Sequence, residues 1–88
     1  MKIEPVDQLG DSRTGSLEDL SYADICRILG FKPNLRDDPD KVRYSWGFTV
    51  DGVRCGIWDY KGSHRSNRWS TFGSAETLRA VFGTHYTS

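Results

Sequence analysis

The segments "KVRYSWGFTV" (residues 41–50) and "VRCGIWDYK" (residues 53–61) flank the dipeptide Asp51-Gly52. Asp-Gly is favoured in the two-residue turns of β-hairpins, and both flanking segments are rich in β-branched and aromatic residues. The stretch therefore predicts an antiparallel hairpin. One face of it is expected to be the core side, with Val50 opposite Val53, Phe48 opposite Cys55, Trp46 opposite Ile57 and Tyr44 opposite Asp59.

The other face of the predicted hairpin has an unusual composition. It pairs Thr49 with Arg54, Gly47 with Gly56, Ser45 with Trp58 and Arg43 with Tyr60. Two facing glycines leave a flat strip of backbone, here bordered by aromatic and basic side chains. Such a strip can admit a planar ligand or the backbone of another protein. The alternative is that the N-terminal segment or a second copy of the chain covers it.

A capping box marks the helix that precedes the hairpin. Ser21 and Asp24 have the required spacing, and Gly30 provides a stop, so we expect a helix that begins near residue 17 or 22 and ends at Leu29. Ser74 caps a second predicted helix over residues 75–82.

The segment "RWSTF" (residues 68–72) predicts a third strand, antiparallel to the second. The expected fold is therefore a two-layer α+β domain, with an antiparallel three-stranded meander sheet between a helix before it and a helix after it. Residues 1–15 lack a sustained hydrophobic period, and we expect a partly ordered N-terminal arm before a single domain over residues 16–88.

The charges of the chain balance but are unevenly placed. Twelve basic residues match twelve acidic ones, so no net field drives non-specific binding to DNA or to an anionic membrane. Residues 1–40 hold nine acids and five bases, a net charge of −4, whereas residues 41–88 hold three acids and seven bases, a net charge of +4. The two halves can screen each other, or two copies can pair head to tail, and we expect a homo-oligomer.

The two cysteines indicate a cellular compartment. Cys26 and Cys55 lie in apolar-patterned segments, which is typical of buried thiols rather than of a disulfide framework, so we expect a cytoplasmic location. The sequence predicts neither a membrane span nor an export signal.

Residues 61–68, "KGSHRSNR", form a predicted loop without an acid. Lys, Arg, His, Ser and Asn side chains all donate hydrogen bonds to phosphate, and neighbouring aromatic rings can stack on a base. The alternative is a solvated loop whose Arg residues pair with the acidic half of the chain. The candidate ligand-binding residues are Arg43, Arg54, Trp58, Tyr60, Lys61, His64, Arg65, Ser66, Asn67, Arg68 and Trp69.

Catalytic chemistry has little support in the sequence. "DYK" (residues 59–61), with Asp51 upstream, resembles the metal and lysine signature of the PD-(D/E)xK nucleases, which implies a divalent-metal nuclease. Asp51 is already explained by the hairpin turn, so this is the weakest of the functional hypotheses. His64 and His85 lack the spacing of a zinc site. We therefore expect no enzyme, no catalytic residue, no metal ligand and no cofactor.

A family resemblance covers about residues 24–83. The order "ILG", a strand with Trp, "DG", "IWDYK" and "WSTFG" resembles that of small uncharacterised proteins of bacteriophages and large DNA viruses. These pair an aromatic-aspartate strand end with a following W-x-x-G. The resemblance implies a viral anti-defence protein that acts in the host cytoplasm. It also implies a binding function, because small phage proteins of this type block a nuclease surface or remove a signalling nucleotide.

Two binding hypotheses follow. The first is a non-catalytic protein that sequesters a small anionic nucleotide-type ligand, with Lys61, Arg65 and Arg68 neutralising phosphate. Trp58, Tyr60 or Trp69 would stack on the base, and His64, Ser66 and Asn67 would supply directional hydrogen bonds. The alternative is an anti-CRISPR-like inhibitor that uses the same surface against a host defence protein.

Overall fold

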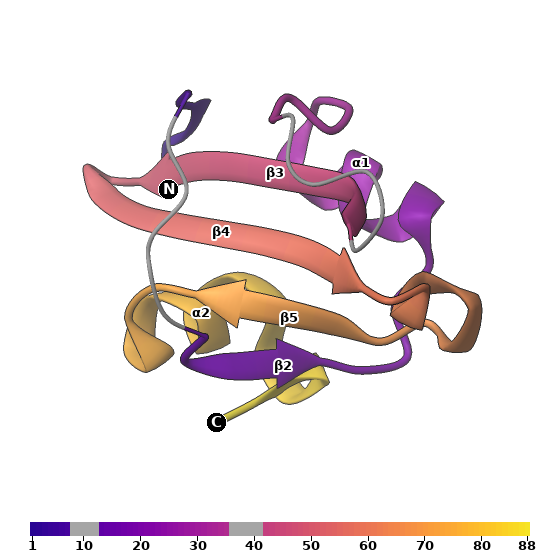
Figure 1. The fold of residues 1–88 in the computed structure, drawn as a ribbon. Coiled ribbons are helices and arrows are strands. Elements are labelled where there is room, and N and C mark those ends of the chain that lie inside the picture. The colour runs from indigo at the N-terminus through magenta and orange to yellow at the C-terminus, as the bar shows by residue number, and fades with distance from the viewer. Residues whose placement is uncertain (8–12, 36–41) are drawn as a thin grey trace.

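The computed structural model describes residues 1–7, 13–35 and 42–88, with only the backbone described for Val42 and Arg43. Within these residues, six strands form one antiparallel sheet, and Figure 1 shows both helices on the same side of it. The elements are β1 (Ile3–Pro5), β2 (Gly15–Leu17), α1 (Tyr22–Leu29), β3 (Val42–Val50), β4 (Val53–Tyr60), the 3₁₀ turn η1 (Ser63–Ser66), β5 (Trp69–Phe72), α2 (Ala75–Phe82), the 3₁₀ turn η2 (Gly83–His85) and β6 (Tyr86–Thr87).

The α+β class is confirmed, but the predicted number of strands is wrong. The order across the sheet is β1-β3-β4-β5-β2-β6, so the meander β3-β4-β5 lies inside a wider sheet. The added strands are only two or three residues long, too short to show a period-two pattern in the sequence. β1 and the first residue of β2 come from the segment predicted to be an arm (residues 1–15). The described part of this segment therefore contributes strands to the same sheet as residues 16–88.

The hairpin is confirmed from Ser45 to Trp58, where all the predicted pairs occur. Asp51 and Gly52 both have positive φ, as a type I′ turn requires. The backbone of Lys2 bonds both the N–H and the side chain of Asp51, so the segment before β1 also holds this turn.

The register beyond Ser45 differs from the prediction. Tyr60 lies opposite Val42, not Arg43, because β3 carries one extra residue between Val42 and Ser45. A bulge of this kind removes a backbone partner from the ladder. The carboxylate of Asp59 takes that place, since its Oδ1 accepts the N–H of Tyr44 at 2.6 Å.

Both predicted helices are confirmed with their caps. α1 begins at Tyr22, the later of the two expected starts, and Ser21 and Asp24 form the predicted capping box. Gly30 ends the helix in the left-handed conformation. Ser74 caps α2, with its hydroxyl accepting the N–H of Thr77.

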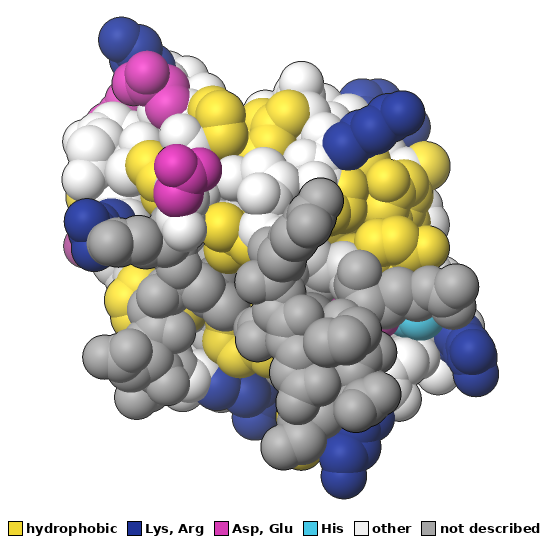
Figure 2. All heavy atoms as spheres, turned by 45° about the horizontal axis from the view of Figure 1, so that its top comes forward, with side chains coloured by type: hydrophobic (Ala, Val, Ile, Leu, Met, Phe, Trp, Pro, Cys, Tyr) yellow, Lys and Arg dark blue, Asp and Glu magenta, His cyan; other side chains and the backbone are white. Residues whose placement is uncertain are grey.

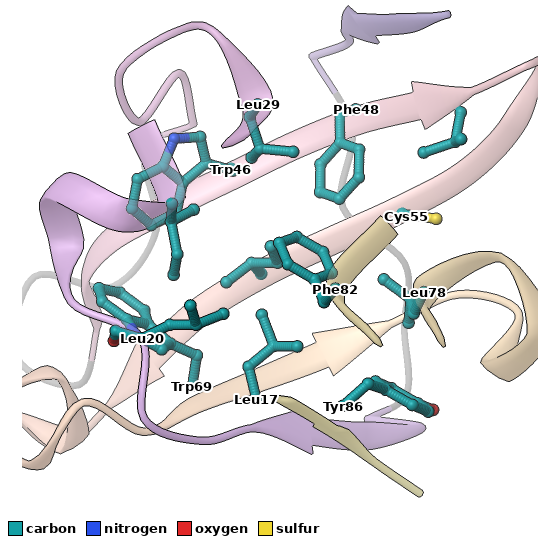
Figure 3. Close-up of a cluster of buried hydrophobic side chains, with 13 residues drawn as sticks. Leu17, Leu20, Leu29, Trp46, Phe48, Cys55, Trp69, Leu78, Phe82 and Tyr86 are labelled. Carbon is teal, nitrogen blue, oxygen red and sulfur yellow. Dashed lines mark hydrogen bonds between the residues drawn. The ribbon is translucent and has the colours of Figure 1, made fainter. Parts of the chain in front are cut away.

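The core lies between the helices and one face of the sheet, and Figure 3 shows helix side chains such as Leu29 and Phe82 directed toward those of the strands. Val53 was expected on the core side but is 41% exposed, because it adjoins the hairpin turn at the end of the strand. The buried hydrophobic residues are Leu17, Leu20, Ile25, Leu29, Trp46, Phe48, Val50, Cys55, Ile57, Trp69, Leu78, Phe82 and Tyr86.

The facing glycines are not an open surface. Gly47 lies opposite Gly56 as predicted, and both are buried. At the edge of β3, the side chain of Asn34 accepts the N–H of Gly47 and donates to its carbonyl. The two glycines are therefore not part of the candidate site.

None of the helices in the described ranges is long and apolar enough to cross a membrane.

Candidate functional site

The end of β4 carries a buried carboxylate. Asp59 alternates with the apolar residues of the core face, and its side chain is 0% exposed. Burial of a charged group is costly unless hydrogen bonds satisfy it. The N–H of Tyr44 supplies one such bond to Oδ1, and the ring of His64 supplies another to Oδ2 at 2.5 Å. Asp59 thus has a structural role toward the backbone of Tyr44.

His64 reaches this carboxylate because of a compact turn. Gly62 and Asn67 bracket η1 with left-handed backbone conformations, which glycine and asparagine tolerate best. Inside the turn, the N–H of Arg65 bonds the carbonyl of Gly62, and the N–H of Asn67 bonds the carbonyl of His64. The turn therefore holds His64 with its Nδ1 facing inward and 17% of its side chain exposed.

Five rings form a closed circuit around this pair. The ring of His64 lies 5.2 Å from that of Tyr44 and 6.3 Å from that of Trp69, measured between centroids. Trp46 lies 5.3 Å from Trp69 and 5.8 Å from Tyr22, and Tyr22 lies 4.7 Å from Tyr44. Tilted and edge-on contacts of this kind fix ring orientation. The imidazole is therefore held by edge-on and tilted ring contacts as well as by a hydrogen bond.

Tyr22 links this circuit to α1. Partial burial raises the pKa of the Tyr22 hydroxyl, and a hydrogen bond with Cys26 and the nearby Tyr44 act in the same direction. The phenol therefore stays neutral at physiological pH and can donate a hydrogen bond.

Figure 2 shows hydrophobic side chains gathered on one part of the surface, next to Lys or Arg side chains and a His.

The outer side of the turn is basic and exposed. Tyr60 is 45% exposed, and the Nζ of Lys61 lies 5.3 Å from the centre of its ring, within cation–π range. Arg65 is also exposed. Because side chains alternate along a strand, Tyr60 leaves β4 on the face opposite to Asp59. The turn therefore lies between two faces of β4. Tyr60 and Lys61 are on one face, and His64 is on the face of Asp59.

Arg68 has a structural partner. It pairs with Glu18 at 3.0 Å, and the carbonyl of Asn67 accepts the N–H of Leu20. These contacts tie the turn to the segment between β2 and α1, which belongs to the acidic half of the chain. For Arg68, the contact is therefore the one expected under the alternative hypothesis, in which Arg residues of the loop pair with the acidic half of the chain.

The structure brings together seven of the predicted site residues and separates the rest. Around η1 lie Tyr60, Lys61, His64, Arg65, Ser66, Asn67 and Arg68. Trp69 is 1% exposed and donates its indole N–H to Leu20, so its ring belongs to the core and cannot stack on a ligand at the surface. Trp58 is half-buried, and Arg54 lies at the far end of β4. The side chain of Arg43 lies outside the described residues.

Sequence reasoning missed three contributors, Tyr22, Tyr44 and Asp59. The available signal was a single acid at a core-facing position of a strand, followed five residues later by a histidine across a short loop. We define the strand-end site as the residues Tyr44, Asp59, Tyr60, Lys61, His64 and Arg65.

A metal centre finds no support in the described part of the chain, where no group of three or more His, Cys, Asp or Glu side chains could hold an ion. Asp51 lies in the turn before β4 and Asp59 near the far end of β4, so they cannot share a metal as the nuclease signature requires.

Comparisons of the chain with protein-family models, with curated proteins and with solved structures found no match. Function is therefore inferred from the geometry of the strand-end site.

Proposed function

We propose that the chain is a non-catalytic binding protein whose strand-end site takes an anionic nucleotide-type ligand. The observation that carries this proposal is the acid-free turn, in which exposed Lys61 and Arg65 flank a histidine that a buried carboxylate holds in place. Phosphate oxygens pair well with such cations, and the exposed ring of Tyr60 is suited to stack on a base.

The two sides of the turn bear on the size of the ligand. Tyr60 and Asp59 point to opposite faces of β4, and His64 follows Asp59. A ligand that contacts both Tyr60 and His64 must therefore pass over the turn, with its phosphates near Lys61 and Arg65. We therefore favour a linear dinucleotide, which carries two bases and two sugars, over a mononucleotide, which would use one side only.

Titration calorimetry with linear and cyclic mono- and dinucleotides tests this function. Replacing Lys61 and Arg65 by Ala should weaken binding of the tightest of these nucleotides at least about tenfold per cation. Arg13→Ala, which removes an exposed cation in the segment before β2, should leave binding unchanged. Absence of heat with every nucleotide, in protein freed of carried ligand, would exclude the proposal.

The resemblance to bacteriophage proteins supports a biological role for such binding. A small viral protein that sequesters a signalling nucleotide would act against host defence in the cytoplasm. Measurement of mass in solution together with the absorbance ratio at 260 and 280 nm tests both a carried nucleotide and the expected homo-oligomer.

An inhibitor of a host protein is the second candidate. Exposed Tyr60 ends β4, and exposed Lys61 and Arg65 lie in the turn that follows, whose backbone is held by internal hydrogen bonds. Exposed Tyr and Arg side chains on a fixed backbone are typical of interface hot spots. A nucleotide-free protein that binds a purified host nuclease complex, and loses this binding in Tyr60→Ala, would favour this candidate over the first.

A further inference from the structure

The two ring nitrogens of His64 have different surroundings. Nδ1 lies 2.5 Å from Oδ2 of Asp59, and Oδ1 of the same carboxylate already accepts the N–H of Tyr44. A carboxylate has no proton to donate, so the hydrogen of this short contact belongs to Nδ1. The neutral imidazole is therefore held as the Nδ1–H tautomer, which leaves a lone pair on Nε2.

Nε2 is the nitrogen that a ligand can reach. Asp59 is fully buried, so the nitrogen that faces it points into the protein, whereas Nε2 is not among the buried side-chain atoms that lack a hydrogen-bond partner. Tyr44 and Trp69 contact the ring and keep it from rotating. Among the described residues, the polar contact of the His64 ring is the one through Nδ1. The site thus presents a fixed hydrogen-bond acceptor beside cations.

We propose, on the basis of the proposed function, that Nε2 of His64 accepts a hydrogen bond from a ribose 2′-hydroxyl of the nucleotide, so that the site prefers ribonucleotides to deoxyribonucleotides. Arg65 follows His64 directly and brings the phosphate next to the imidazole. In a nucleotide the sugar adjoins the phosphate, whereas the amino groups of the base lie farther away. Asp59 is then a positioning residue, which acts through the tautomer of His64.

The substitution Asp59→Asn inverts this acceptor with almost no change in shape. The amide oxygen can still accept the N–H of Tyr44, but the amide NH₂ now donates to Nδ1. The hydrogen of the neutral ring moves to Nε2, which becomes a donor, so a ribose hydroxyl can pair with it only by accepting. Asp51→Asn is the matched control, because it makes the same change at the other end of β4.

Two measurements test the proposal. Long-range ¹H–¹⁵N spectra of the neutral ring should show Nδ1–H in the wild type and Nε2–H in Asp59→Asn. In calorimetry, the wild type should bind the diribonucleotide pApA about tenfold more tightly than its deoxy counterpart, which is the effect of one hydrogen bond. Relative to pApA, its 2′-O-methyl counterpart, whose 2′ oxygen can only accept, should bind more tightly to Asp59→Asn than to the wild type. Binding of pyrophosphate, which has no sugar, should stay the same.

The outcomes separate this proposal from the function on which it rests. If the wild type binds none of the probes, the nucleotide function and the ribose preference both fail. If it binds them without a ribose preference, or if the 2′-O-methyl counterpart gains nothing in Asp59→Asn, only the role of His64 is overturned. Should Asp59→Asn not fold, the wild type still decides, because an Nε2–H tautomer or equal binding of pApA and its deoxy counterpart contradicts the proposal.

Discussion

At the residue scale, single side chains in the core face of the sheet decide both stability and reactivity. Asp59 is tolerated in this face because a bulge frees the N–H of Tyr44 and a turn brings the ring of His64 to its second oxygen. Loss of either the bulge or the turn would remove one of these two hydrogen bonds from a buried carboxylate. The bulge and the turn therefore depend on the same residue.

The two thiols should differ in reactivity. Burial raises the pKa of the Cys55 thiol to about 11, and this side chain is 1% exposed, whereas Cys26 is half-buried. Because the thiolate is the reactive form, we expect one fast-reacting thiol at about pH 8 in the folded protein and two after unfolding. A thiol titration with a chromogenic disulfide measures this. Two fast thiols in the folded state, or one remaining in Cys26→Ser, would contradict the assignment.

Asp24 should make the stability depend on acid pH. The backbone N–H and hydroxyl of Ser21, and then Arg27, lower the pKa of Asp24 below its ordinary value of 3.8. A lowered pKa in the folded state stabilises the protein above the ordinary value, and this contribution is lost as the pH falls through the lowered one. The difference in unfolding free energy between wild type and Asp24→Asn should therefore shrink between about pH 6 and about pH 2. Denaturant titrations at several pH values measure it, and a constant difference would argue against the capping charge.

At the element scale, local signals were strong for the hairpin and both helices. Asp51-Gly52 set the register, and Ser21 with Gly30 set the ends of α1, since turn and cap chemistry is local in sequence. The strands β1, β2 and β6 depend on partners far along the chain, so their few residues carry no pattern of their own. The Asp59–His64 contact escaped prediction for the same reason, because it needs the shape of the turn.

The connection between β5 and α2 should be sensitive to a single methyl group. Gly73 has a φ of +126°, and a Cβ there would lie 2.8 Å from the carbonyl oxygen of Arg54 and 2.9 Å from Sγ of Cys55. We expect Gly73→Ala to reduce the unfolding free energy by about 2–4 kcal/mol, from backbone strain and overpacking combined.

Gly30→Ala is the matched control for this prediction. Gly30 also has a positive φ, of +91°, but a Cβ there would meet nothing within 4 Å. Only the backbone term applies, so the loss should be about 1–2 kcal/mol. The unfolding free energies of both variants are measured by denaturant unfolding. Equal losses would show that the close approach of β4 to Gly73 does not contribute to the free energy of unfolding.

At the scale of the whole molecule, the sheet joins both ends of the described chain. β1 pairs with β3 at one edge, and β2 lies between β5 and β6 near the other, while both helices pack on the same core. Because none of the described elements has a separate core, we expect unfolding in one cooperative transition.

Two spectroscopic signals test this cooperativity. Far-ultraviolet circular dichroism follows the sheet and helices, and tryptophan fluorescence follows the core through buried Trp46 and Trp69. The two denaturation curves should coincide at every denaturant concentration. A fluorescence change that precedes the loss of ellipticity would show that the aromatic circuit opens on its own.

The position of β2 between β5 and β6 also has a consequence for synthesis on the ribosome. Leu17 emerges early, but its neighbours Trp69 and Tyr86 are added near the end of the described chain. The nascent chain can close the hairpin of β3 and β4 while β2 still has two bare edges. The growing chain is thus exposed to wrong pairing until β6 is added, and slower translation would lengthen that period.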